Sequence, residues 1–264
     1  MCGIGLVNKD DKHAPQIIKA ANCELYTYSE ESKEADFVAS DIRYVSQPDF
    51  VGTEFHISGK YDMEVRLGIP GLFNVVNALA AVSVCSFLGL DQARISHALE
   101  NIRVNGRMEI VYTSERCTVL VDYAHNAVSM ESLLSTLRDY KPKRLVCVFG
   151  CGGNRSKDRR YSMGEIGGKM ADLSIITADN SRYEKVEDII ADIRGSIEKT
   201  GGKFIEIPDR REAIRYSILH AQPGDMVAVI GKGHEDYQEI NGVRHHFLDR
   251  EVIEETVKEL GEKA

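Results

Sequence analysis

The feature that most constrains the fold is an alternation of β-branched runs and helical patterns in the second half of the chain. Five strand candidates lie at residues 118–122, 145–149, 173–177, 203–207 and 226–230. Helical patterns lie between or after them, at residues 129–140, 162–170, 186–198, 210–220 and 250–260. This alternation predicts an α/β fold, with a Rossmann-like, mostly parallel sheet that has helices on both faces.

The first hundred residues have a different pattern, so we place a domain boundary that divides residues 1–103 from residues 104–264. In the first part we expect a strand at 4–8, helices at 14–21, 74–88 and 91–101, and short alternating segments up to residue 71. Near the end of the chain, Asn241-Gly242 stands between apolar residues. Because both residues accept positive φ, this pair predicts a β-hairpin.

Composition excludes several classes of protein. The formal net charge of -8 argues against a nucleic-acid-binding surface. No apolar run approaches the roughly 20 residues that span a bilayer, and the first residues lack a signal-peptide pattern. We therefore expect a cytoplasmic monomer without membrane insertion. The cysteines are scattered without metal-ligand spacing, which predicts reduced thiols.

Polar side chains and glycines follow four of the strand candidates, at residues 122–125, 150–155, 179–182 and 231–235. In a parallel sheet the loops after the strands converge at one edge, where ligands bind. Each loop alone is also compatible with a helix cap or a plain turn. Together, however, the four loops bring charged and polar side chains to the same edge. In chain order, the loops contribute Asp and His, then Gly and Arg, then Asn and Arg, and finally Gly and Glu.

These residue types suit a zwitterionic ligand. The donors of Asn180 and Arg182 match a planar carboxylate, and Arg155 lies in a loop with further cations. At Gly231 the backbone can approach a ligand closely, and Glu235 suits an ammonium group. The chain contains neither a dinucleotide-binding glycine fingerprint nor a Walker A loop. The lack of the dinucleotide fingerprint argues against an NAD-linked oxidoreductase.

Six segments, in this order and spacing, resemble the Mur ligase family, and most closely its diaminopimelate-adding members. They are residues 71–77, 105–109, 122–125, 149–153, 179–182 and 231–235. The resemblance implies that residues 1–103 are the carboxy-terminal part of a central ATP-binding domain. It implies that residues 104–264 are the domain that binds the incoming amino acid.

The resemblance also implies a reaction and its ligands. The parent enzyme would use ATP and Mg²⁺ to add meso-diaminopimelate to UDP-MurNAc-L-Ala-D-Glu in peptidoglycan synthesis. The expected ATP-binding residues are Asn74, Asn77, Arg107, Asp122 and His125, and the expected amino-acid-binding residues are Arg155, Asn180, Arg182, Gly231 and Glu235. No residue of the chain is assigned as catalytic or as a metal ligand.

Arg182 is the expected specificity residue, because the diaminopimelate-adding members carry this arginine and the lysine-adding members lack it. Two positions depart from the family pattern. Ser181 and Ala127 stand where proline is usual, which predicts looser loops but removes no functional side chain.

We expect the phosphate-binding loop and the Mg²⁺ ligands of the parent enzyme to lie upstream of this chain. The chain alone is therefore expected to be inactive. Two alternatives stay open: a non-catalytic module that binds diaminopimelate or a partner subunit, and another ligase of the superfamily, such as a folylpolyglutamate or cyanophycin synthetase.

Overall fold

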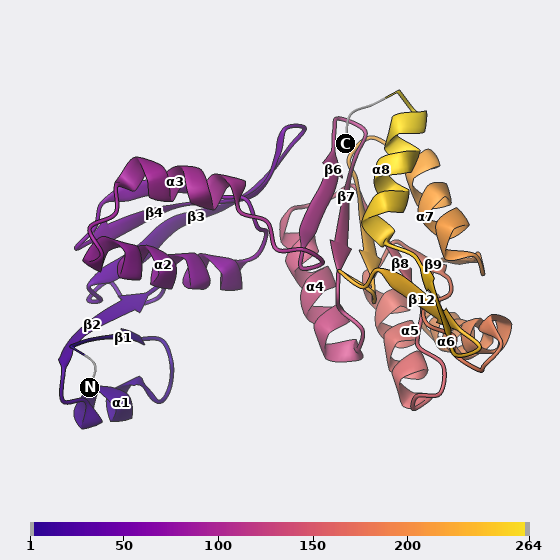
Figure 1. Cartoon of the computed structure of the whole chain (residues 1–264), viewed down its shortest axis with the longest axis horizontal. Coiled ribbons are helices and arrows are strands. Elements are labelled where there is room, and N and C mark those ends of the chain that lie inside the picture. Colours follow the sequence, from indigo (N-terminus) through magenta and orange to yellow (C-terminus); the bar gives the residue numbers. More distant parts are fainter. Residues whose placement is uncertain (1–2, 262–264) are drawn as a thin grey trace. The chain divides into compact units, whose positions relative to one another are not determined.

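The computed structural model describes residues 3–261 and divides the chain into two compact units (Figure 1). The first unit holds the residues up to 46 and residues 50–103. The second unit holds residues 47–49 and the chain from residue 104 onward.

The first unit is built on a five-stranded mixed sheet. Its strands, in spatial order, are β1 (Ile4–Asn8), β2 (Glu24–Ser29), β3 (Phe37–Gln47), β4 (Phe50–Gly59) and β5 (Met63–Leu67). The first three strands run parallel, whereas β4 and β5 pair antiparallel. The strand predicted at residues 4–8 is confirmed, and the short alternating segments after it are four further strands.

Helices α1 (Ala14–Ala20), α2 (Leu72–Phe87) and α3 (Gln92–Asn101) complete the first unit. Helix α2 buries Val75, Leu79 and Val82, whose spacing puts them on one helical face. They pack with Phe55 of β4 in a continuous apolar core. The helices predicted here are confirmed, with ends that differ by one or two residues.

The second unit contains a six-stranded sheet with the order β10-β9-β8-β11-β7-β6. The strands are β6 (Glu109–Thr113), β7 (Cys117–Asp122), β8 (Arg144–Phe149), β9 (Leu173–Ile176), β10 (Phe204–Glu206) and β11 (Asp225–Ile230). All neighbours are parallel except β6, which runs antiparallel to β7. The predicted mostly parallel sheet is confirmed, and β6 is an addition to the five strands expected.

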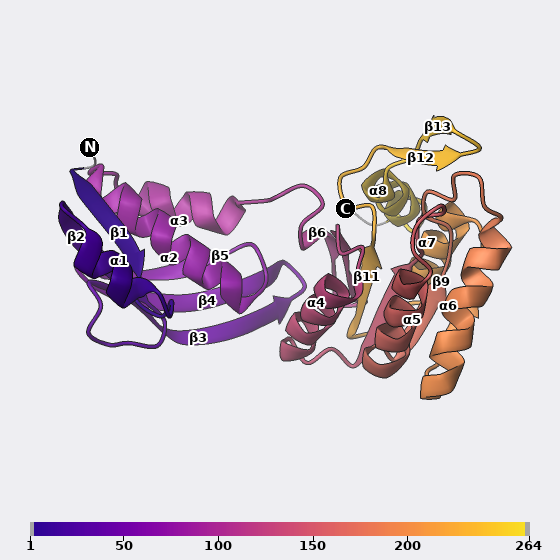
Figure 2. The same cartoon turned by 90° about the horizontal axis from the view of Figure 1, so that it is seen from below.

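Helices cover both faces of this sheet (Figure 2). One face carries α4 (Ala127–Asp139), α5 (Asp158–Met170) and α6 (Val186–Thr200), and the other carries α7 (Arg210–Leu219) and α8 (Asp249–Glu259). Alternate strand residues such as Val119 and Val121 pack in one apolar core with Ile214 of α7 and Ile253 of α8. Helix α5 begins at Asp158, earlier than the predicted residue 162.

A hairpin of β12 (Tyr237–Ile240) and β13 (Val243–His246) follows the sheet. Asn241 and Gly242 form its turn with φ of 50° and 76°, so the predicted hairpin is confirmed. None of the helices between residues 3 and 261 is both long enough and apolar enough to cross a bilayer.

Candidate functional site

A pocket of about 380 Å³ opens where the loops after β7, β8, β9 and β11 meet. It lies within the second unit and is lined by Tyr123, His125, Gly150, Cys151, Gly152, Arg155, Arg159, Asp179, Asn180, Arg182, Gly231, Glu235 and Tyr237. The lining therefore includes His125 and every residue predicted to bind the amino acid. A volume of this size is at the lower end of the roughly 300–1,000 Å³ of small-molecule sites.

Three arginines line the pocket, Arg155, Arg159 and Arg182. The guanidinium groups of Arg155 and Arg159 have no hydrogen bond or ion pair with any residue in the part of the chain that the structure describes. The third, Arg182, donates from Nη1 to the carbonyl oxygen of Gly153 at 2.7 Å, and its Nε lies 3.6 Å from the carboxylate of Glu239. These three residues leave guanidinium donors available to an anionic group.

Arg182 is held by its own backbone as well. Its φ is 52°, a left-handed conformation that is uncommon for a residue with a side chain. Its N–H donates to the carbonyl of Glu239 at 3.0 Å, and its carbonyl accepts from the N–H of Asn241 at 2.6 Å. The hairpin therefore fixes the backbone from which the Arg182 side chain extends.

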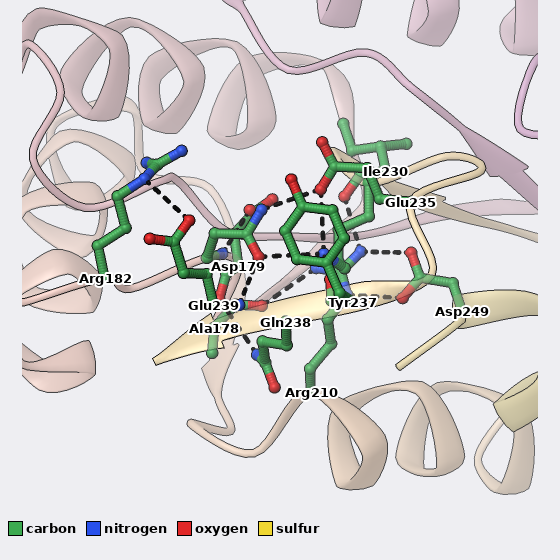
Figure 3. A network of polar contacts seen from close by, with 12 residues as sticks. Ala178, Asp179, Arg182, Arg210, Ile230, Glu235, Tyr237, Gln238, Glu239 and Asp249 are labelled. Atoms are coloured by element: carbon green, nitrogen blue, oxygen red, sulfur yellow. Dashed lines mark hydrogen bonds and ion pairs between the residues drawn. The ribbon is translucent and has the colours of Figure 1, made fainter. Parts of the chain in front are cut away.

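Glu235 lines the pocket and belongs to a network of polar contacts (Figure 3). Oε2 of Glu235 accepts from Nδ2 of Asn180 at 2.9 Å and from Nζ of Lys232 at 3.2 Å. Oδ1 of Asn180 accepts from the N–H of Glu239 at 2.9 Å. The loop after β9, the loop after β11 and strand β12 are thus joined by one polar network.

Below this network, Arg210 joins the ends of two strands. Its guanidinium donates to the carbonyl of Ala178, just after β9, at 3.2 Å, and to the carbonyl of Ile230, at the end of β11, at 3.0 Å. It also forms a two-point ion pair with Asp249. Burial disfavours the charged guanidinium, but the carboxylate of Asp249 more than compensates and raises the pKa of Arg210.

Positive φ and close contacts explain two glycine positions in the loop after β11. Gly231 has a φ of 111°, and a Cβ on it would lie 2.8 Å from Oδ2 of Asp179. Gly233 and Gly106 face each other so closely that a Cβ on Gly106 would lie 2.5 Å from the carbonyl carbon of Gly233. Side chains at these positions would push the loops apart.

Three of the predicted ATP-binding residues lie beside the pocket. Asp122 ends β7 and is buried, with its two carboxylate oxygens accepting the backbone N–H groups of Met108 and Ala124 at 2.8 and 2.7 Å. Burial raises its pKa, and these two hydrogen bonds act in the opposite direction. The carboxylate of Asp122 thus ties the segment before β6 to the end of β7.

The other two residues, Arg107 and His125, both contact Tyr123. The guanidinium of Arg107 lies 4.8 Å from the centre of the Tyr123 ring, and Nδ1 of His125 lies 2.9 Å from the Tyr123 carbonyl oxygen. Asn74 and Asn77 lie on α2 in the first unit, where Nδ2 of Asn74 donates to the carbonyl of Pro70 at 2.7 Å. The ATP-binding role of these residues stays a prediction.

Two further observations concern acidic, histidine and cysteine side chains. Over residues 3–261, no group of three or more His, Cys, Asp or Glu side chains is arranged to hold a metal ion. The described cysteines are unpaired, and Cys151 lines the pocket with its thiol pKa raised to about 12 by burial. Cys151 therefore contributes a protonated, neutral thiol to the lining of the pocket.

Sequence reasoning missed several residues of the site, above all Lys232 and Arg210. Both are fully buried charges, whereas a charge in or beside a loop usually indicates a solvated surface. The sequence feature that could have identified Lys232 as part of the site is its position within the Gly-Lys-Gly-His-Glu segment. Tyr123 and Tyr237 also line the pocket, and neither was predicted to bind a ligand.

The fold and this constellation of loops define a class of protein, and comparisons with known proteins identify the same class. Residues 1–85 match the Mur ligase middle domain, and residues 106–233 match the Mur ligase glutamate ligase domain. The chain belongs to the Mur ligase family.

Several of the similar proteins carry the same name. The chain is 38% identical over 259 residues to the UDP-N-acetylmuramoyl-L-alanyl-D-glutamate–2,6-diaminopimelate ligase of Caldanaerobacter subterraneus subsp. tengcongensis, covering 96% of this chain and 52% of that protein. It is 41% identical to the ligase of the same name from Trichormus variabilis, covering 94% and 50%. A solved structure of a ligase of this name superposes with a TM-score of 0.79 at 34% identity, covering 98% and 54%. The chain thus spans about half the length of these relatives.

Proposed function

We propose that this chain holds the amino-acid substrate of an ATP-dependent amide ligase, and that the substrate is meso-diaminopimelate. The supporting observation is that one pocket is lined both by three arginines and by the carboxylate of Glu235. The arginines suit a carboxylate of the ligand, and Glu235 suits an ammonium group. The relatives are named as diaminopimelate ligases, which supports the same substrate.

The number of arginines favours diaminopimelate over lysine. Diaminopimelate carries a carboxylate at each end, whereas lysine has only one. Arg155, Arg159 and Arg182 offer more cationic donors than one carboxylate needs. With lysine in the pocket, the guanidinium donors beyond those that bind its single carboxylate would have no second carboxylate of the ligand to bind, which favours diaminopimelate.

The acceptor of the amino acid would be UDP-MurNAc-L-Ala-D-Glu, and ATP would supply the energy by activating the carboxylate to be joined. Arg107 and His125, which flank Tyr123 next to the pocket, fit a role on the nucleotide side of the reaction. Asp122 fits a supporting role, since both its carboxylate oxygens bind backbone amides. We assign no magnesium ligand to this chain.

This chain's contribution to catalysis would be the orientation of the attacking amine. The carboxylate of Glu235 and the arginines of the pocket would hold the ammonium and carboxylate groups of the substrate, which converts a bimolecular attack into an oriented one. The sequence contains no Gly-x-x-x-x-Gly-Lys-Ser/Thr segment. We propose that the 264-residue chain by itself does not transfer phosphate from ATP.

Isothermal titration of the chain with meso-diaminopimelate, L-lysine and L-glutamate tests the proposal. We expect diaminopimelate to bind at least about tenfold more tightly than either competitor. Equal binding of lysine would remove the substrate assignment. Preferential binding of glutamate would favour a ligase of the folylpolyglutamate type instead.

A further inference from the structure

Lys232 is a charged side chain with no exposure to solvent, in the loop between β11 and β12. Transfer of an ammonium group from water into a protein interior costs several kcal/mol unless the group is paired and hydrogen-bonded. A fold that buries this lysine beside a polar pocket must therefore surround it with acceptors.

The ammonium group has a full set of such acceptors. Nζ lies 3.3 Å from Oδ1 of Asn180 and 3.2 Å from Oε2 of Glu235, and it also donates to the carbonyl oxygen of Tyr237. Since an ammonium group has three N–H donors, these three acceptors use them all. Lys232 does not line the pocket. Its action on a ligand must therefore pass through its neighbours.

The first neighbour is Asn180, whose side-chain amide has only one favourable orientation. Its Oδ1 accepts from Lys232 and from the N–H of Glu239 at 2.9 Å. A flip of the amide would bring its NH₂ group against two donors. The amide nitrogen consequently faces the pocket side, where it donates to Glu235 at 2.9 Å.

The second neighbour is Glu235, whose two carboxylate oxygens are used differently. Oε2 accepts from both Lys232 and Asn180, whereas Oε1 has no hydrogen-bond partner among residues 3–261. Glu235 lines the pocket. Two donors on one oxygen fix the carboxylate plane, so the free oxygen has a defined position.

We infer that Lys232 is a positioning residue that presents Oε1 of Glu235 to an ammonium group of the amino-acid substrate. Lys232 does this by binding the other oxygen of Glu235 and by fixing the amide of Asn180. The inference rests on the proposed function of the pocket. It adds a residue that contacts no substrate yet determines how the substrate's amine is held.

Replacement of Lys232 by methionine tests the inference, because Lys232→Met keeps an unbranched chain but removes the ammonium group. We expect the affinity for meso-diaminopimelate, measured by isothermal titration, to fall roughly 10- to 100-fold. Lys169→Met is the matched control, since Lys169 pairs with Glu165 on the exposed surface of α5. Unchanged affinity in a folded Lys232→Met variant would overturn the inference.

A double-mutant cycle separates positioning from general destabilisation. Because Lys232 acts through Glu235, Lys232→Met should have little further effect on affinity in a Glu235→Gln background. Additive losses from the two substitutions would overturn the inference. A loss of affinity caused by unfolding would be accompanied by loss of the dispersed ¹H–¹⁵N spectrum, which the control and cycle variants should all retain.

A measurement without ligand keeps the inference distinct from the proposed function. In the ligand-free chain, the Lys232 ammonium and the Asn180 side-chain amide should give ¹H–¹⁵N signals that exchange slowly with water. If these signals are present but no amino acid binds, the proposed function fails and the Lys232 geometry stands. Rapid exchange of both signals would overturn the Lys232 geometry itself.

Discussion

The guanidinium of Arg210 and the carboxylate of Asp249 form a two-point ion pair, with both nitrogen–oxygen distances at 2.7 Å and both side chains fully buried. The pair joins the first residues of α7 and α8. Arg210 also binds the carbonyls at the ends of β9 and β11. One side chain therefore sets the spacing of the two strand ends from which the Asn180 and Glu235 loops start.

Removal of one member of this pair should destabilise the second unit strongly. Asp249→Asn would leave the Arg210 charge buried without a counterion, which typically costs about 3–5 kcal/mol of unfolding free energy. Urea denaturation measures the loss. The exposed pair between Arg211 and Glu255 also joins α7 and α8, so Glu255→Gln is a matched control with a much smaller expected effect. Equal losses in the two variants would contradict this prediction.

Arg182→Ala should abolish the preference for meso-diaminopimelate over L-lysine with little effect on lysine affinity. The substitution removes a guanidinium that can bind a distal carboxylate, but it retains the backbone hydrogen bonds of residue 182 to Glu239 and Asn241. The ratio of the two dissociation constants from isothermal titration is the measurement. An unchanged ratio would assign the distal carboxylate to Arg155 or Arg159 instead.

Gly231→Ala should destabilise the chain and weaken binding in the pocket. At a φ of 111°, alanine is strained by about 1–3 kcal/mol, and its Cβ would crowd Asp179. Thermal denaturation measures the effect. Gly195→Ala is the control: a Cβ at this position in α6 meets nothing within 4 Å, so the change should raise stability by about 0.5–1 kcal/mol. Destabilisation by both substitutions to the same extent would refute the steric argument.

The chain should lose stability on acidification through Glu184. Hydrogen bonds from Arg160 and from the N–H of Asn154 hold the pKa of Glu184 below its ordinary value of 4.5. Because the folded pKa is the lower one, the stabilisation is complete above pH 4.5 and is lost as the pH falls through the folded pKa.

Urea midpoints measured between neutral and acidic pH test this dependence. The midpoint of Glu184→Gln should change less below the ordinary glutamate pKa than the midpoint of the wild type. Glu131→Gln, on the exposed surface of α4, should follow the wild type. A Glu184→Gln curve parallel to the wild-type curve would show that the Arg160 ion pair does not contribute.

The Cys151 thiol, which lines the pocket, should resist alkylation. Burial raises the pKa of Cys151 to about 12 and that of Cys117 to about 11, so neither is a thiolate at mildly alkaline pH. Iodoacetamide at mildly alkaline pH should modify the half-buried Cys23 and Cys85 first, as read by mass spectrometry. Modification of all of these cysteines in urea is the control, and early labelling of Cys151 in the folded chain would be the contrary result.

The strands β7, β8, β9 and β11 of the second unit were predictable because nearly all of their residues are buried, on both faces. Strand β7, for instance, is buried at every residue from Cys117 to Asp122, so its sequence is mostly apolar and ends in an aspartate. The Asn241-Gly242 turn was predictable for a local reason, since few residue pairs accept positive φ twice. Both signals lie in short stretches of sequence.

Other strands gave no such signal. Strand β3 is buried only at its start and is exposed or half-buried over most of its length, so its sequence lacks a clear period. Strand β6 lies at the edge of its sheet and pairs antiparallel through an irregular register. What stabilises these strands is their pairing with distant segments, which a local pattern does not contain.

Several residues that line the pocket were predictable from the sequence, whereas the buried residues that support them were not. Asn180, Arg182 and Glu235 belong to loops whose order along the chain carries the signal. Lys232 and Arg210 have carboxylate and carbonyl partners that come together only in the folded protein. A buried charge can be identified only when those partners are known.

The close approach of Gly106 and Gly233 has a consequence for how such a sequence can change. A Cβ on Gly106 would collide with the backbone of residues 233 and 234, and a Cβ on Gly233 would lie 2.8 Å from the Gly106 carbonyl oxygen. Neither position can gain a side chain unless the opposite backbone retreats. Two motifs far apart in the chain thus constrain each other's sequence. A substitution that adds a side chain at one of these glycines is tolerated only if the backbone of the other motif moves.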